Sequence, residues 1–283
     1  MKNRKKQFKN FLVHLFLACL VLIWVAPIAW IILISFRAET GAYTSTFFPK
    51  SYTINNYVRL FTETSLFDFP LWFRNTLIVA CFSCVVSTFY TLSVSYTMSR
   101  MRFKLRKKFM NIALVLGMFP GFMSMIAVYY ILKGVGLTTG ALKLVSLVLV
   151  YSGGAGLLFY VAKGFFDTIP KAIDEAAIID GCTRWQIFTN ITVPLSKPII
   201  VQTIITSFMS PWMDFIFSKV IAGSESKYYT VAVGLWNMLE KENITNYYTR
   251  FAAGAVIVSI PMAILFLSIQ KYYMESNAGA VKG

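Results

Sequence analysis

Residues 76–99 read TLIVACFSCVVSTFYTLSVSYTMS and carry no charged side chain. An α-helix rises about 1.5 Å per residue, so roughly 20 mostly apolar residues cross the ~30 Å hydrocarbon layer of a bilayer. This stretch is therefore long and apolar enough to span a membrane. Five further stretches pass the same test, at residues 11–35, 109–132, 141–162, 199–222 and 251–270. The sequence thus predicts an all-α, polytopic membrane protein with six transmembrane helices.

The composition of the whole chain agrees with this class. Of 283 residues, 57% are hydrophobic and 14% are charged, and the mean hydropathy is +0.63, whereas soluble domains are about 25% charged. The net charge of +15 would suit nucleic acid, but the basic residues stand beside apolar stretches rather than on a polar domain. We expect membrane lipid around the chain and no nucleic-acid partner. The first stretch is too long for the core of a secretory signal, so we expect it to be retained.

The distribution of basic residues predicts the orientation. If both termini are cytoplasmic, 17 of the 27 Lys and Arg residues fall in the inner segments, and six of these lie between Arg100 and Lys108. Loops rich in Lys and Arg stay on the cytoplasmic side. We therefore expect cytoplasmic N- and C-termini in a plasma membrane.

Three regions follow from the spacing of the stretches. Residues 1–70 are expected to form the first transmembrane helix and an external segment rich in aromatic and turn-forming residues. Residues 71–275 hold the other five spans and are expected to form the transport domain. Residues 276–283 are expected to be a cytoplasmic tail.

The sequence lacks the motifs of a catalytic protein. No glycine is followed by lysine, so the phosphate-binding loop of an ATPase cannot be built from this chain. Cys81 and Cys84 lie in an apolar run without a second ligand pair, and His14 is the only histidine. We expect no metal, no cofactor and no catalytic site, and any ATP hydrolysis must occur on another polypeptide.

One polar segment has strong local signals. Residues 165–198 read FFDTIPKAIDEAAIIDGCTRWQIFTNITVPLSKP and lie between the fourth and fifth spans, on the cytoplasmic side by the charge count. Pro170 suits the first turn of a helix over 171–180, and Gly181 is placed to end it in a left-handed turn. Thr183 and Gln186 have the spacing of a capping box that opens a second helix, which Pro194 is expected to stop.

This segment resembles the signature of the binding-protein-dependent permeases of bacterial ABC importers. That signature is Glu-Ala-Ala, three residues, Gly, nine residues and Ile-x-Leu-Pro. The chain matches it at 175–177, at Gly181 and at 191–194, with Val193 in place of leucine. The flanking residues, the run 212–215 and the tail 278–283 are similar to the carbohydrate-uptake branch of that family, maltose and maltodextrin permeases in particular.

The resemblance implies a non-catalytic subunit of the bacterial cytoplasmic membrane that translocates a sugar by alternating access. Its implied partners are an ABC ATPase dimer, a second permease subunit and an extracytoplasmic sugar-binding protein. A short rigid helix could pass force to such a motor, with small residues allowing close approach and a carboxylate as anchor. The residues expected to carry coupling are Glu175, Ala176, Ala177, Asp180, Gly181, Ile191 and Pro194.

The substrate path is less defined by the sequence. Asp214 lies within an apolar stretch, where a carboxylate must face protein or water. Trp212, Tyr129 and Tyr130 could stack on sugar rings, although aromatic residues also gather at membrane interfaces. The alternative function is a stand-alone secondary transporter or channel driven by an ion gradient, for which more ionisable residues within spans would be expected.

Overall fold

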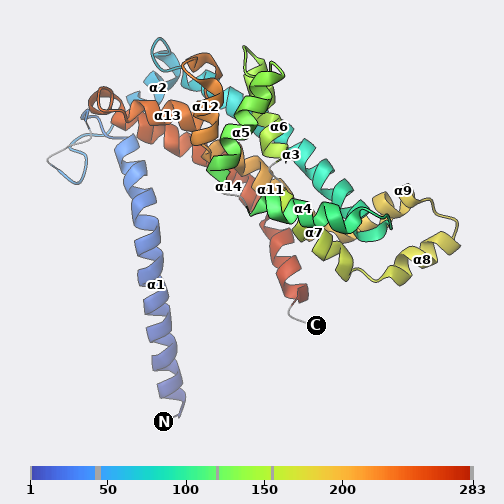
Figure 1. Ribbon diagram of the computed structural model, residues 1–283. Coiled ribbons are helices and arrows are strands. Elements are labelled where there is room, and N and C mark those ends of the chain that lie inside the picture. Colours follow the sequence, from blue (N-terminus) through green and yellow to red (C-terminus); the bar gives the residue numbers. More distant parts are fainter. Residues whose placement is uncertain (1, 42–45, 119–120, 154–155, 281–283) are drawn as a thin grey trace. The chain divides into compact units, whose positions relative to one another are not determined.

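The computed structural model describes residues 2–41, 46–118, 121–153 and 156–280 (Figure 1). These residues form helices and connecting loops and contain no β-strand. The helices are α1 (Lys2–Ser35), α2 (Asn55–Thr62), α3 (Phe69–Arg100), α4 (Arg106–Gly117), α5 (Gly121–Gly134), α6 (Leu142–Gly153), α7 (Gly156–Thr168), α8 (Lys171–Ile179), α9 (Arg184–Ile187), α10 (Val193–Leu195), α11 (Lys197–Met213), α12 (Ile216–Ala222), α13 (Val231–Met238) and α14 (Ile244–Ala280).

Four segments are long and apolar enough to cross a membrane. They are Lys6–Ser35, Phe69–Arg100, Leu142–Thr168 and Ile244–Gln270, the third of which runs across residues 154–155 outside the described ranges. A fifth candidate is a bent pair, Arg184–Leu195 with Lys197–Met213, whose halves meet at 79°. The predicted all-α class with several apolar helices is confirmed, and the number of six spans stays a prediction.

One predicted stretch is interrupted, and another is described only in part. The stretch 109–132 corresponds to α4 and α5, which have 12 and 14 residues and are separately too short to span; residues 119–120 between them lie outside the described ranges. The stretch 199–222 breaks between α11 and α12 at Asp214. A count of apolar residues cannot reveal such a break, because it depends on where a polar side chain finds its partners.

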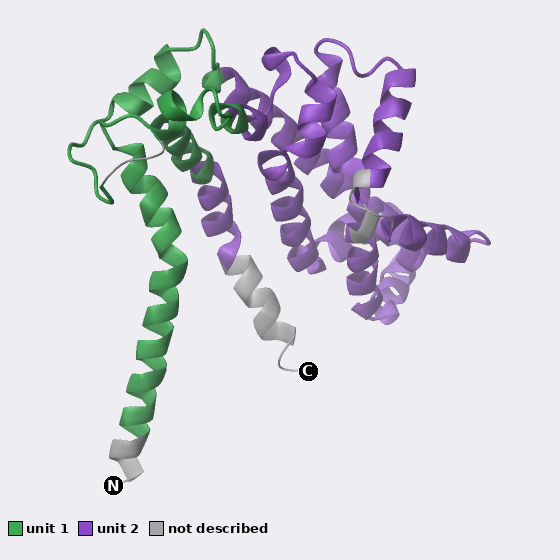
Figure 2. Cartoon of the chain, turned by 60° about the vertical axis from the view of Figure 1, so that its left-hand side comes forward, with its two compact units in different colours: residues 1–70, 235–259 green, residues 71–234, 260–283 purple. Residues whose placement is uncertain are grey.

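The chain divides into two compact units (Figure 2), residues 1–70 with 235–259 and residues 71–234 with 260–283. In the first unit, the buried Asn56 amide donates to the carbonyls of Ser35 and Arg37, at 2.9 and 2.8 Å. The Thr249 hydroxyl donates to the Asn56 carbonyl oxygen at 3.0 Å. One α2 side chain therefore ties the end of α1 to the first turns of α14.

In the second unit, the start of α3 is fixed to the loop before α13. The Trp72 indole donates to the Ser226 carbonyl at 3.0 Å, and the Val231 N–H donates to the Thr76 hydroxyl at 2.8 Å. Trp72 is 1% exposed and packs against Gly234, where an added Cβ would lie 1.9 Å from the indole ring. Gly234 is therefore required by close packing.

We expect Gly234→Ala to lower the stability of the protein by about 1–3 kcal/mol, because the buried indole must move to admit the methyl group. The measurement is thermal unfolding in detergent. The matched control is Gly121→Ala, since a Cβ at that helical position meets no atom within 4 Å. Equal melting temperatures for the two variants would contradict the packing argument.

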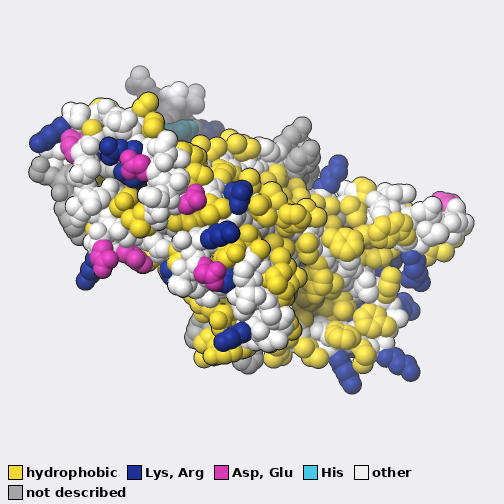
Figure 3. Space-filling model, turned by 90° about the horizontal axis from the view of Figure 1, so that it is seen from above, with side chains coloured by type: hydrophobic (Ala, Val, Ile, Leu, Met, Phe, Trp, Pro, Cys, Tyr) yellow, Lys and Arg dark blue, Asp and Glu magenta, His cyan; other side chains and the backbone are white. Residues whose placement is uncertain are grey.

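Hydrophobic side chains cover much of the surface seen in Figure 3. Of the four long apolar segments, the one in α1 is the least buried, with only 6% of its most apolar window buried within the chain. An apolar surface of this extent is stable in lipid but not in water. The exposed side chains thus agree with a membrane environment for the apolar helices.

Candidate functional site

The predicted helix–glycine–helix segment is present. Helix α8 follows Pro170 and is closed by two bonds beyond its end, from the Gly181 N–H to the Ile178 carbonyl at 3.0 Å and from the Cys182 N–H to the Ala177 carbonyl at 2.9 Å. This pair of bonds is a Schellman motif, which needs a left-handed residue. Gly181 supplies it with φ +84°. The expected left-handed turn is confirmed, and we call residues 171–187 the elbow.

The second half of the elbow opens with the predicted capping box. The Gln186 N–H donates to the Thr183 hydroxyl at 3.3 Å, and the Thr183 N–H donates to the Gln186 side-chain oxygen at 2.7 Å. These bonds satisfy two backbone donors that a helix start leaves free. They also fix the direction in which α9 leaves the glycine turn.

Pro194 does not stop the second helix, contrary to expectation. After α9, a π-helical turn covers Phe188–Thr192, and α10 then includes Pro194 and ends at Leu195. A proline is tolerated in the first turn of a helix because no intrahelical N–H bond is required there. The change of direction comes at Ser196, before α11 begins.

The end of α3 fixes the elbow through polar contacts. The Arg100 Nε lies 3.0 Å from an Asp174 carboxylate oxygen, with side chains 5% and 15% exposed. The Arg100 Nη2 also donates to the Ile169 carbonyl at 2.9 Å. One residue earlier, the Ser99 hydroxyl donates to the Asp167 carboxylate at 2.6 Å. Movement of the elbow is therefore coupled to α3.

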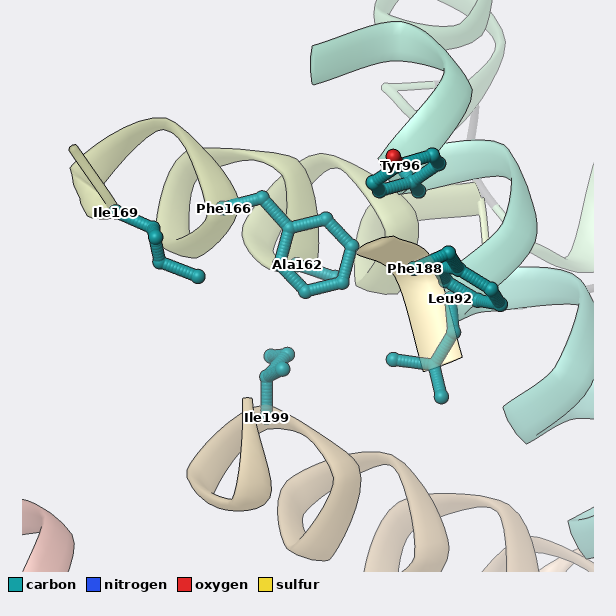
Figure 4. Packing of buried hydrophobic residues seen from close by; sticks show 7 residues of the cluster. All are labelled: Leu92, Tyr96, Ala162, Phe166, Ile169, Phe188 and Ile199. Carbon is teal, nitrogen blue, oxygen red and sulfur yellow. The ribbon is translucent and has the colours of Figure 1, made fainter. Parts of the chain in front are cut away.

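A hydrophobic cluster supports the same junction (Figure 4). It joins α3, α7, the π-helical turn and α11 through Leu92, Tyr96, Ala162, Phe166, Ile169, Phe188 and Ile199. The rings of Tyr96 and Phe188 lie 4.8 Å apart, and Tyr96 hydroxyl donates to the Arg184 carbonyl at 3.4 Å. Packing and polar contacts together make the elbow a rigid projection rather than a loose loop.

Three large apolar side chains of the elbow are exposed. Ile179 is 87% exposed, Trp185 is 64% exposed and Ile178 is 54% exposed. Large apolar side chains gathered beside carboxylates on a rigid element are typical of a surface that another protein covers. The sequence signals for caps and turns do not single out these three residues. Their only sequence signal is that they are large apolar residues close to Gly181 in a polar segment.

The residues predicted to carry coupling divide between two sides of the segment. Glu175, Ala176, Asp180 and Gly181 are exposed, whereas Ala177 faces inward and is 6% exposed. The other two predicted positions lie beyond the elbow, with Ile191 half-buried and Pro194 exposed. The first four are therefore accessible, as the exposed isoleucines are.

Asp214 stands at the break between α11 and α12. Its carboxylate accepts from the Tyr151 hydroxyl at 2.6 Å and from the Phe217 N–H at 3.2 Å, which caps the start of α12. It also lines a cavity of about 830 Å³ between α5, α6 and α12, and it is the only charged residue among the described residues lining that cavity. The carboxylate thus has a structural role and access to a large apolar space.

The aromatic candidates are placed differently. Trp212 is 3% exposed and packs against the rings of Phe73 and Phe208. Tyr129 is half-buried beside the core around Leu147, and Tyr130 is 64% exposed. The rings of the two tyrosines are 5.6 Å apart. Of the aromatic candidates, Tyr130 is the one most open to a ligand.

A helical membrane protein with a bent span and a rigid, partly apolar elbow has the architecture of a transport permease. The chain belongs to the family described as binding-protein-dependent transport system inner membrane component, whose sequence model matches residues 91–274. This match includes the whole elbow and α11. The family resemblance read from the signature is confirmed, and the family places the chain in a bacterial inner membrane.

Several relatives cover nearly the whole chain. The galactooligosaccharides transport system permease protein GanQ of Bacillus subtilis is 33% identical over 95% of this chain and 94% of that protein. The maltodextrin permease MdxG of the same organism is 31% identical, covering 95% of each. The maltose/maltodextrin permease MalG of Escherichia coli is 28% identical, covering 100% of this chain and 99% of that protein.

A solved structure has the same fold. A chain in the crystal structure of a bacterial ABC transporter involved in import of the acidic polysaccharide alginate aligns with a TM-score of 0.79 and 21% identity, covering 95% of this chain and 98% of that chain. A second structure, of a bacterial alginate ABC transporter with an alginate pentasaccharide-bound periplasmic protein, gives a TM-score of 0.68 and 16% identity, covering 95% and 97%. Both likenesses concern the fold alone.

Proposed function

We propose that this chain is a membrane-spanning permease subunit of an ATP-driven, binding-protein-dependent importer, and that its cargo is an oligosaccharide. Family membership supports the importer class, and the names of the relatives support a sugar. Maltodextrin is our first candidate because permeases named for it are similar over almost the full chain. Galactooligosaccharides are the second candidate, on the same kind of support.

The observation that carries this proposal is the rigid elbow with an uncovered outer surface. A separate ATPase must transmit a conformational change to the membrane helices, and the contact must therefore resist bending. The Schellman turn and the capping box fix the shape of the elbow, and Arg100 connects it to α3. We infer that Glu175, Ala176, Asp180 and Gly181 face the ATPase, together with the neighbouring isoleucines.

The exposure of α1 supports a second permease subunit as a further partner. Helix α1 is largely unburied within its own chain, which leaves room for a second permease subunit beside it. We propose six spans, with α4 and α5 as the third and α11 and α12 as the fifth. Both termini, and the tail 276–283, are then cytoplasmic. The segments 37–74 and 223–250 are external and available to a sugar-binding protein.

For the substrate path, we propose the cavity beside Asp214. The carboxylate can accept hydrogen bonds from sugar hydroxyls, and the apolar walls suit the faces of sugar rings. Tyr130 is exposed enough to stack on a ring, whereas the buried Trp212 is suited to positioning α11. In this proposal residues 1–70 serve assembly, and residues 71–275 form the transport domain.

Reconstitution tests the function. The chain is placed in proteoliposomes with the permease, ATPase and binding protein encoded beside it, and uptake of labelled maltodextrin and galactooligosaccharide is measured. We expect uptake that requires internal ATP and every partner. Uptake by the chain alone along an ion gradient would instead establish the secondary-transporter alternative. Uptake of amino acids or metal ions in place of sugars would refute the proposed cargo.

A further inference from the structure

A second cavity, of about 180 Å³, lies at the junction between α3, α4 and the elbow. Its walls carry more positive than negative charge. The basic lining residues are Arg100, Arg102, Arg106, Lys171 and Arg184, and the acidic ones are Asp174 and Glu175. A single water needs about 10–15 Å³ of such space, so the cavity can hold a polyatomic ligand.

The positive charge exceeds the negative charge around this cavity, because five basic side chains face two carboxylates in its lining. Arg100 pairs with Asp174, but the side chains of Arg102, Arg106, Lys171 and Arg184 form no hydrogen bond or ion pair among the described residues. Glu175 in the same cavity and Asp167 near Arg106 offset only part of the repulsion among these cations. The arrangement of the basic side chains around one cavity favours an anion.

The floor of the cavity also offers specific hydrogen-bonding atoms. The Arg100 side chain is 95% buried, and its Nη1 donor has no partner. The Asp174 Oδ1 acceptor beside it is also buried without a partner. Such groups cost free energy unless a ligand satisfies them. A fitting ligand therefore combines an anionic oxygen for Arg100 with a hydroxyl that can donate to Asp174.

We propose that this cavity binds one hydroxyl-bearing phosphate group. Hydrogen phosphate ion has both features, and so does a phosphatidylglycerol headgroup, which joins a phosphate to a glycerol hydroxyl. The phosphate oxygens accept from the buried guanidinium and face the surrounding cations, while the hydroxyl donates to Asp174. Sulfate has the charge but lacks the hydroxyl at neutral pH. Glu175 and Ile178 line this cavity and also belong to the surface proposed to face the ATPase, so binding is tested on the chain without its partners.

Calorimetry on the full-length chain in zwitterionic detergent tests the site, with inorganic phosphate and sulfate as probes. We expect saturable phosphate binding and weaker sulfate binding. Phosphate should also slow amide hydrogen exchange over residues 171–187, because the ligand joins the elbow to α3. Absence of saturable phosphate binding in detergent, together with unchanged exchange in the lipid experiment below, would refute the proposal.

The source of the phosphate is identified in nanodiscs. Discs of phosphatidylcholine alone are compared with discs that also contain phosphatidylglycerol, in each case with and without inorganic phosphate. Protection of the elbow by phosphatidylglycerol alone assigns the site to lipid, and protection by free phosphate in both discs assigns it to a cytosolic anion. Both outcomes support a phosphate site, and protection by neither would contradict it.

Charge variants separate the cavity from general attraction by a basic loop. The double variant Arg106→Gln with Arg184→Gln removes two lining cations whose side chains form no hydrogen bond or ion pair among the described residues, and should weaken phosphate binding by about tenfold or more. Lys107→Gln with Lys108→Gln removes two charges from the same region outside the cavity and should leave affinity within about twofold. Equal losses in the two double variants would show diffuse electrostatics and overturn the proposal.

Discussion

Gly181→Val is expected to leave the protein in the membrane at normal levels and to abolish most sugar uptake, while the ATPase continues to hydrolyse ATP. The backbone at this position has φ +84°, where a β-branched residue costs about 1–3 kcal/mol. This cost does not come from steric overlap with neighbouring residues, since an added Cβ at Gly181 meets no atom within 4 Å. The elbow would open, and its outer surface would lose its fixed direction.

The measurement is labelled-sugar uptake and ATP hydrolysis on the same proteoliposomes. A shift of about 1.4 kcal/mol changes a population tenfold, so uptake should fall by about tenfold or more. Gly181→Asn should retain much of the uptake, because asparagine tolerates the left-handed region. Gly164→Ala, at a helical glycine with open space, is the second control. Normal coupling in Gly181→Val would argue against a force-transmitting elbow.

Asp174→Asn is expected to destabilise the protein and detach α8 from α3. The substitution leaves the buried Arg100 guanidinium without its counter-ion, and removing one partner of a buried pair costs about 3–5 kcal/mol. The 15% exposure of Asp174 places the expected loss near the lower end of that range. The melting temperature in detergent should fall, and proteolysis should cleave the elbow sooner.

Two variants make this result specific. Glu175→Gln changes the adjacent carboxylate, which is exposed and forms no ion pair among the described residues, so its melting temperature should stay near that of the wild type. Arg100→Met with Asp174→Leu replaces the whole pair by apolar side chains and should recover much of the stability. If Asp174→Asn and Glu175→Gln have the same melting temperature, the Arg100–Asp174 ion pair does not hold α8 against α3.

The features that the sequence could predict are local ones. Gly181 and the Thr183–Gln186 pair act within a few residues of themselves, so the turn and the capping box follow from spacing alone. The Arg100–Asp174 contact joins residues 74 positions apart, and nothing in either neighbourhood reveals it. Long apolar runs likewise predict the membrane class, since hydropathy needs no knowledge of neighbours.

Interruptions within apolar runs could not be predicted in the same way. The sequence places Asp214 within one apolar stretch, whereas in the structure α11 ends before Asp214, and its carboxylate accepts from Tyr151 and caps the start of α12 at Phe217. The sequence also predicts a helix end at Pro194, whereas a π-helical turn precedes this proline and α10 continues to Leu195. Both errors arise where helix geometry departs from the regular α-form.

The isolation of α1 has a consequence for how the protein is made. This helix is synthesised before the other apolar helices described here, and its surroundings within the chain are almost those of a single helix in lipid, with 6% of its most apolar window buried. A translocon can therefore release it without waiting for later segments. The Asn56 contacts that hold its end to α14 form only after α14 is synthesised. A helix that can enter the bilayer before α3 to α14 is thus attached to the rest of its unit only after they are made.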